Sequence, residues 1–192
     1  MAFQAEVEKI PPEDLVFLDE SGVTTSMCRL YARAPRGERA YSRAPAGRYE
    51  RLTLLGALSL DGISALMMIA AFTDERVFQA FVDQVLVPSL RAGQTVVLDN
   101  LPAHKRPGVK ASIEAAGCRL LFLPRYSPEY NPIEPCWSKM KNELRTRAAR
   151  TLTALEGAVA AAMESVTLGD ARGWFTHCGY NGSAHEMEKI GR

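Results

Sequence analysis

Two short apolar segments of this chain each run directly into an aspartate. Residues 15–18 (Leu-Val-Phe-Leu) precede Asp19, and residues 95–98 (Thr-Val-Val-Leu) precede Asp99. Short apolar runs of this kind are typical of strands buried inside an α/β sheet, where ligands bind at the carboxyl ends of the strands. If the two strands are adjacent and parallel, both acids emerge side by side at one edge of the sheet.

Strand-like and helix-like segments alternate along the rest of the chain. Strands are predicted over residues 51–60, 63–72 and 118–123, and helices after Thr73 and Asp74, over residues 107–116, beyond Glu134 and over residues 152–166. Asp61-Gly62 predicts a hairpin between the first two of these strands. We expect residues 152–166 to form the last helix. Strands interleaved with helices imply an α/β fold, with a central mixed five-stranded sheet and helices on both faces.

A third acid, Glu134, stands at the start of a predicted helix. With Asn131 as cap and Pro132 in the first position, Glu134 lies where a glutamate stabilises a helix start, which is a purely structural interpretation. Pro135 weakens that interpretation, because it forfeits an early helical hydrogen bond unless the helix begins there. Asp19 and Asp99 also have a structural alternative, since aspartate favours turns and loop starts.

Acids at the edge of a buried sheet cost desolvation free energy unless their charge is compensated. Divalent Mg²⁺ is a suitable compensating ion, because it prefers oxygen ligands and is often held by one or two carboxylates. The three acids therefore predict a metal site if folding brings them together.

Three motifs resemble one protein family. They are Asp19-Glu20-Ser21-Gly22, then Leu98-Asp99-Asn100 with His104-Lys105, then Tyr126-Ser127-Pro128-Glu129-Tyr130-Asn131-Pro132-Ile133-Glu134 with Trp137 and Lys141. These motifs are similar to the catalytic domain of DDE transposases, in particular to the bacterial insertion-sequence relatives of the mariner superfamily. The 34 residues between Asp99 and Glu134 are typical of that branch. The resemblance runs from about residue 13 to residue 180 and implies a ribonuclease H-like fold.

The resemblance implies that Asp19, Asp99 and Glu134 are the catalytic residues and the ligands of two Mg²⁺ ions, with Mn²⁺ as a substitute. Asp19 is expected to bridge both ions. Water then frees a 3′-hydroxyl at the element end, and this hydroxyl attacks target DNA at the same site. Asn100 and His104 are expected to orient the ligating carboxylates.

A local basic stretch predicts a DNA surface in a chain whose net charge is only +1. Residues 28–51 hold seven arginines and two glutamates with interleaved tyrosines, which suits phosphate contact and stacking. A solvated hairpin is the alternative. The predicted DNA contacts are Arg36, Arg39, Arg43, Lys105, Lys139, Lys141 and Arg145. Trp137 is expected to belong to the core, because its predicted helical face is apolar.

Residues 1–192 are expected to form a single catalytic domain. Only 18 residues precede Asp19, too few for the helix-turn-helix modules that such transposases carry. The expected partners are therefore element-end and target DNA, a second copy in a homodimer or synaptic complex, and a separate helix-turn-helix chain. No apolar run approaches a membrane span and the N-terminus is no signal peptide, which favours a cytoplasmic, nucleoid-associated protein.

Two other functions compete with a transposase catalytic domain. One is a non-catalytic DNA-binding or dimerisation remnant of a decayed or split transposase. The other is a ribonuclease H-like nuclease that acts on RNA–DNA hybrids. Retention of all three acids argues against the first, and the Asn131-Pro132-Ile133-Glu134 segment argues against the second.

Overall fold

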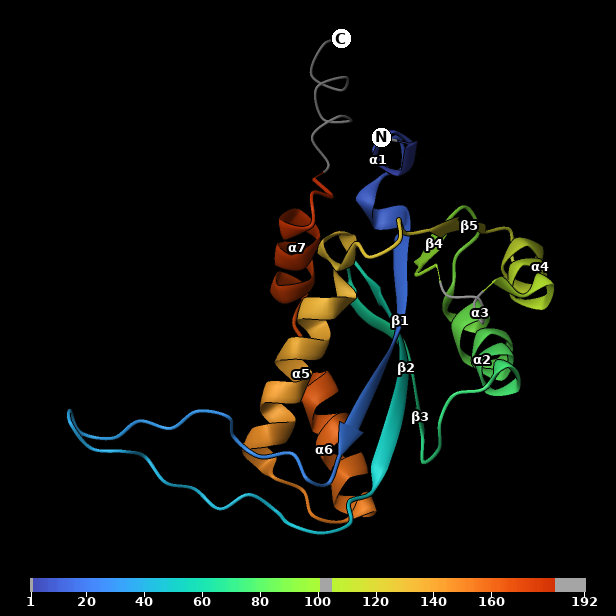
Figure 1. The fold of residues 1–192 in the computed structure, drawn as a ribbon. Helices are drawn as coiled ribbons and strands as arrows, with labels where there is room; N and C mark the ends of the chain where they lie inside the picture. Colours follow the sequence, from blue (N-terminus) through green and yellow to red (C-terminus); the bar gives the residue numbers. More distant parts are fainter. Residues whose placement is uncertain (1, 101–104, 182–192) are drawn as a thin grey trace.

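A mixed five-stranded sheet forms the centre of the molecule. The structure is a computed structural model, and it describes residues 2–100 and 105–181. The strands are β1 (Leu15–Thr24), β2 (Arg51–Ser59), β3 (Gly62–Ile69), β4 (Thr95–Leu98) and β5 (Arg119–Phe122). Their order in the sheet is β3-β2-β1-β4-β5 (Figure 1). β1 pairs antiparallel with β2 and parallel with β4, which confirms the predicted mixed sheet.

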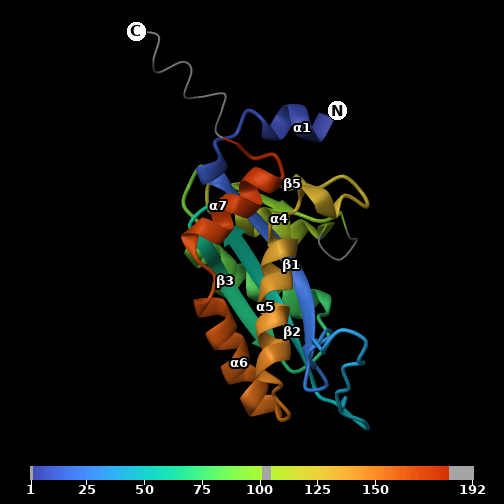
Figure 2. The same ribbon diagram turned by 90° about the vertical axis from the view of Figure 1, so that its left-hand side faces the viewer.

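Helices cover both faces of this sheet, as predicted. They are α1 (Ala2–Val7), α2 (Glu75–Phe81), a π-helical continuation η2 (Val82–Leu86), α3 (Val87–Ser89), α4 (Pro107–Ala115), α5 (Ile133–Arg147), α6 (Leu152–Glu164) and α7 (Leu168–His177). Short 3₁₀ turns precede β1 (η1, Pro12–Asp14) and α5 (η4, Pro128–Tyr130). Figure 2 shows α5, α6 and α7 in front of the sheet, and α2, α3 and α4 lie on its other side in Figure 1.

Two hydrophobic cores, one on each face of the sheet, follow from the alternation of side chains along β1. Phe17 packs with residues of α5, α6 and α7, whereas Val16 and Leu18 pack with residues of α2, η2 and α4. Successive side chains of a strand point to opposite faces. Asp19, two residues after Phe17, therefore shares the face that α5 covers. The ring of Phe175 from α7 packs edge-on against Phe17, with 5.3 Å between ring centroids.

Two boundary predictions are wrong. The first strand does not end at Asp19 but runs on to Thr24, because β2 continues to pair with it as far as Arg51. Residues 152–166 are not the last helix, because α7 follows. Thr167 opens α7 with a capping box in which its hydroxyl and the Asp170 carboxylate accept from each other's backbone N–H groups.

A long segment between β1 and β2, which we call the arginine arm (residues 29–50), projects from the body of the molecule (Figure 1). Every residue of the arm is exposed. Its root is held by hydrogen bonds between Thr25 and Glu50, and by Arg150, which donates to the carbonyls of Thr25 and Met27 at 2.9 and 2.8 Å. Among the described residues, no helix is long and apolar enough to cross a bilayer.

Candidate active site

Strand register places Asp19 and Asp99 next to each other. In the parallel pair of β1 and β4, Leu18 is the partner of Leu98, and an aspartate follows each leucine. Adjacent strands lie roughly 4.8 Å apart, and partner positions present their side chains on the same face. β4 ends at Leu98 while β1 continues, so Asp99 opens a loop and Asp19 lies within a strand.

The start of α5 supplies Glu134. The helix begins at Ile133, and the backbone N–H of Glu134 donates to the carbonyl of Asn131 at 3.1 Å. Asn131 does not cap the helix with its side chain, so the structural interpretation of this segment is wrong in that respect. Pro135 costs no hydrogen bond, because the first four N–H groups of a helix lack intrahelical partners in any case. The Glu134 side chain is left exposed at the helix start.

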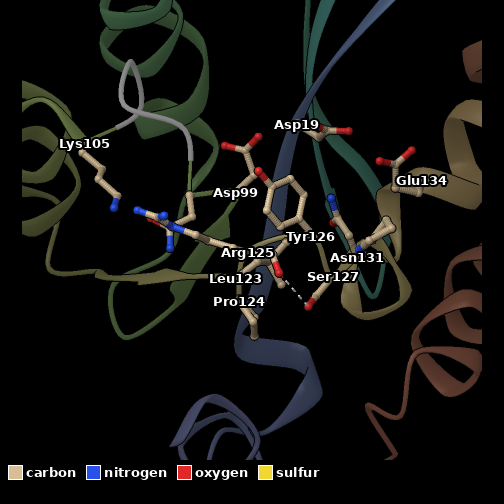
Figure 3. Close-up of a pocket in the computed structure, with 12 residues that line it drawn as sticks. Asp19, Asp99, Lys105, Leu123, Pro124, Arg125, Tyr126, Ser127, Asn131 and Glu134 are labelled. Carbon is tan, nitrogen blue, oxygen red and sulfur yellow. Dashed lines mark hydrogen bonds between the residues drawn. The ribbon is translucent and has the colours of Figure 1, made fainter.

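The three acids line one pocket of about 520 Å³ (Figure 3). Its lining residues are Asp19, Asp99, Asn100, Lys105, Leu123, Pro124, Arg125, Tyr126, Ser127, Pro128, Asn131 and Glu134. In Figure 3 the carboxylates of Asp99, Asp19 and Glu134 lie along one side, and Lys105 and Arg125 lie on the left. The pocket thus combines a carboxylate side with two cationic side chains, an arrangement that suits a phosphodiester beside a cation.

Electrostatics make the anionic form of Asp19 costly in this pocket. Burial raises the pKa of Asp19 to about 7, and the charges of Glu134 and Asp99 raise it as well. Hydrogen bonds from the backbone of Glu20 and the indole of Trp137 act in the opposite direction. A cation bound beside Asp19 would offset both the burial and the like charges.

The residues of the pocket fit a divalent cation by their chemistry. Beside the three carboxylates, the buried side-chain oxygens of Asn100 and Asn131 have no hydrogen-bond partner within the described residues. Hard oxygen acceptors of this kind are the ligands that Mg²⁺ and its bound waters prefer. The side chains do not form a closed cage, however: across residues 2–100 and 105–181, no three His, Cys, Asp or Glu residues are close enough to hold one ion together.

The loop before α5 contributes two pocket residues that were not among the predicted site residues, Arg125 and Tyr126. Tyr126 has a left-handed backbone (φ 56°) and a side chain that is 99% exposed, and it lines the pocket. A positive φ in a bulky residue was not readable from the sequence. The loop is anchored at Tyr130, whose carbonyl accepts from the Tyr180 hydroxyl at 2.6 Å and whose hydroxyl accepts from Gln4 at 2.8 Å.

The other predicted site residues separate into several groups. Asn100 and Lys105 line the pocket, and Lys105 also lies 5.6 Å from the centre of the Phe122 ring. His104 lies outside the described residues. The remaining predicted DNA contacts lie away from the pocket lining: Arg36, Arg39 and Arg43 in the arginine arm, and Lys139, Lys141 and Arg145 on α5.

Lys139 and Arg145 already have protein partners. The ammonium group of Lys139 donates to Asp170 of α7 at 2.5 Å, and Arg145 donates to Asn142 at 3.0 Å. Trp137 is buried in the core, with an exposed fraction of 3%. Its indole N–H nevertheless donates to Asp19 Oδ2 at 3.0 Å, a contact that its apolar helical face gave no reason to expect.

Solved transposase structures share this fold. A Mos1 transposase paired-end complex with the left transposon end superposes with a TM-score of 0.76 at 14% sequence identity, covering 95% of this chain and 57% of that one. A Mos1 mariner paired-end complex with Mn gives 0.75 at 15% identity, covering 92% and 56%. The Mos1 transposase catalytic domain with raltegravir and Mg gives 0.69 at 12% identity, covering 92% and 84%. The sheet and its flanking helices are therefore a ribonuclease H-like fold of the transposase type, as predicted.

The family follows from the sequence itself. The family model of the DDE superfamily endonucleases matches residues 14–156, and this chain belongs to that family. A search of curated proteins gives no match. The chain spans just over half the length of the Mos1 transposase in its DNA complexes.

Proposed function

We propose that the chain is the catalytic domain of a DNA transposase, and that Asp19, Asp99 and Glu134 are its catalytic carboxylates. The observation that carries the proposal is their shared pocket, which also contains Lys105 and Arg125. Membership of the DDE endonuclease family and the fold shared with a transposase support it. Two divalent cations held by the three carboxylates would activate the attacking oxygen and stabilise the leaving oxygen of a phosphodiester.

The carboxylates and the cationic side chains of the pocket have different proposed roles around the scissile phosphate. Asp19 lies between the other two acids in Figure 3, so it would contact both ions, and Asp99 and Glu134 would each hold one of them. Lys105 and Arg125, on the left of the pocket in Figure 3, would hold non-bridging phosphate oxygens. Attack by water on phosphorus breaks the bond to the 3′ oxygen and leaves a 3′-hydroxyl. In a second displacement this hydroxyl attacks the phosphorus of a target phosphodiester, forms a new phosphodiester and breaks the bond to the target's own 3′ oxygen, which leaves as a 3′-hydroxyl.

DNA outside the pocket would be held by basic side chains on the arginine arm and on α5. Arg36, Arg39 and Arg43 are exposed in the arm, so phosphate contact does not require breaking a buried ion pair. Lys141 and Arg145 extend the basic surface along α5, whereas Lys139 must leave Asp170 to reach a phosphate. A synaptic dimer and a separate chain that recognises element ends complete the proposed assembly.

Nicking of supercoiled plasmid DNA with Mg²⁺ or Mn²⁺ tests the proposal. Asp19→Asn, Asp99→Asn and Glu134→Gln should each lower the nicking rate by roughly 10³-fold or more, because charge stabilisation by such ions is worth several kcal/mol. Asp61→Asn is the matched control, since it removes an exposed acid of the β2–β3 turn. Full nicking by a folded Asp99→Asn protein would contradict the proposal.

A DNA-binding measurement and an RNA–DNA hybrid substrate, used beside the nicking assay, separate the competing functions. DNA binding by the wild-type chain without nicking would favour a non-catalytic module. Cleavage of an RNA–DNA hybrid in preference to duplex DNA would favour a ribonuclease H-type activity.

A further inference from the structure

Two residues outside the proposed set of ligands surround Asp19. The Cα partner of Asp19 in the β1–β2 ladder is Gly56. From α5, the indole N–H of Trp137 reaches across and donates to Asp19 Oδ2 at 3.0 Å. A strand carboxylate, a strand glycine and a helix indole therefore meet at one point of the sheet.

Gly56 provides the space that the indole occupies. A Cβ atom built on Gly56 would lie 3.1 Å from Cζ2 of Trp137 and 2.6 Å from its Cη2, and the second distance is shorter than real Cβ contacts show. Gly56 lies within β2 and is not among the glycines with positive φ, so its backbone conformation does not require a glycine. A glycine in a strand often marks the close approach of another group. Here that group is the ring of Trp137.

We propose that Trp137 is a positioning residue for Asp19, with Gly56 as the seat of its ring. The inference rests on the proposed function of Asp19 as a bridging metal ligand. A carboxylate turns easily about its last side-chain bond, because that torsion has a broad profile. One fixed N–H donor on Oδ2 selects an orientation, so that the carboxylate loses less freedom when a cation binds.

The placement of Trp137 on α5 gives the contact a further consequence. Trp137 follows Glu134 by three residues, so the two lie on the same side of one helix. The indole that contacts Asp19 and the carboxylate that shares its pocket are therefore carried by one rigid element. If Trp137 served only to fill the core, its aromatic ring would be needed but its indole N–H would not. Replacing Trp137 by phenylalanine keeps an aromatic ring and removes the N–H, so this variant distinguishes the packing role from the positioning role.

Binding of Mn²⁺, measured by electron paramagnetic resonance without DNA, tests the role directly. Trp137→Phe removes the N–H donor and should raise the half-saturating Mn²⁺ concentration about 10-fold or more, the range found for partners of metal ligands. Trp174→Phe is the matched control, since it changes the partly buried tryptophan of α7, and its Mn²⁺ affinity should equal that of the wild type. Circular dichroism establishes that each variant is folded.

Gly56→Ala gives a second test that leaves the N–H donor in place. The added methyl must displace the ring of Trp137, so Mn²⁺ affinity should fall in the same direction although no polar group is lost. This variant keeps the proposal falsifiable if Trp137→Phe does not fold.

Fluorescence supplies a readout that is independent of affinity. In the Trp174→Phe protein the emission comes from Trp137 alone, because the chain has two tryptophans. Mn²⁺ should quench this emission over the same concentration range in which it binds, and Asp19→Asn should abolish that response.

The outcomes distinguish this inference from the proposed function. Equal Mn²⁺ affinity in the wild type and in folded Trp137→Phe and Gly56→Ala proteins would overturn the positioning role of Trp137 but would leave the proposed metal site intact. Failure of the wild type to bind Mn²⁺ would overturn the metal site and the positioning role together. Saturable binding with unchanged Trp137 emission would place the ion away from Asp19 and would also overturn the inference.

Discussion

Gly56, which has no side chain, leaves the space beside Asp19 in which Trp137 packs. Gly56 lies opposite Asp19 in the β1–β2 ladder, and the space above it is filled by Trp137 from the helix layer. Any larger residue at position 56 would separate the helix from the strand at the level of the acidic pocket. The close approach of β2 to α5 is therefore a packing requirement with consequences for stability as well as for the site.

Gly56→Ala should destabilise the fold by about 1–3 kcal/mol, the usual cost of inserting a methyl group into a filled core. Besides Trp137, the new methyl would lie 3.3 Å from Cδ1 of Leu66. Urea unfolding measures the change. The matched control is Gly157→Ala in α6, where an added Cβ meets nothing within 4 Å in the described part of the chain. That variant should gain about 0.5–1 kcal/mol from helix propensity. Equal effects of the two substitutions would contradict the packing argument.

The three acids of the candidate site could be predicted from the sequence, but the residues that contact them could not. Asp19 and Asp99 were predictable because each follows an apolar run, and parallel register then places them together. The length of β1 was not predictable, since Glu20-Ser21-Gly22 has the composition of a turn and becomes a strand only through pairing with β2. The contact between Trp137 and Asp19 joins two elements distant in sequence, and no local pattern encodes it.

At the scale of elements, α5 and α7 are joined by an ion pair that also belongs to a helix cap. Asp170 accepts from the backbone and hydroxyl of Thr167 at the start of α7 and from Lys139 of α5. Hydrogen bonds from Lys139 and Thr167 lower the pKa of Asp170 to about 2. The carboxylate thus fixes the start of α7 and connects it to the helix that carries Glu134.

Asp170→Asn should lower the free energy of unfolding at pH 7 by about 1 kcal/mol, as loss of a helix cap usually does. Because the folded-state pKa of Asp170 lies below its ordinary value of 3.8, the stabilisation is fully present above about pH 4 and is lost as the pH falls towards 2. Urea midpoints of the wild type and Asp170→Asn should therefore differ at pH 7 and converge below pH 4. A pH-independent difference would show that the charge of Asp170 is irrelevant. Asp61→Asn serves as the control.

Elements with strong local signals were predictable, and those that depend on tertiary packing were not. The predicted β2–β3 hairpin is present, although its turn residues are Leu60 and Asp61 and Gly62, at φ 109°, is the first residue of β3. Asp74 caps α2, as the sequence indicates. Helix α7 escaped prediction because Gly169 and Gly173 weaken its helical propensity. Its stability comes from the capping box and from Phe175, which packs on Phe17 of β1.

On the scale of the whole molecule, the basic residues of the pocket are separate from those of the arginine arm. Lys105 and Arg125 lie in the acidic pocket, whereas the arginine arm extends away from the sheet and helices (Figure 1). The arm leaves the body between β1 and β2, and its tyrosines at positions 31, 41 and 49 are exposed. A surface of this kind suits contact with a long, charged partner better than packing on its own domain.

Replacing Arg36, Arg39 and Arg43 together by alanine should weaken duplex DNA binding and flatten its salt dependence. Each lost phosphate contact reduces the slope of log affinity against log salt by about 0.9, so the slope should fall by up to about 3. Arg76→Ala, Lys110→Ala and Arg172→Ala combined form a control of equal net charge, since these exposed cations lie on α2, α4 and α7. Fluorescence anisotropy at several salt concentrations measures both triple variants. Equal losses in both would assign the effect to overall charge and not to the arm.

Asp19, Asp99 and Glu134 come from β1, from the loop after β4 and from the start of α5, and the last of them lies far along the chain from the first. A nascent chain on the ribosome consequently possesses no acidic pocket until synthesis has passed α5 and that helix has docked on the sheet. Unfolded and incompletely synthesised copies cannot bring the three carboxylates together, so under the proposed function we expect DNA cleavage only from chains that have folded through α5.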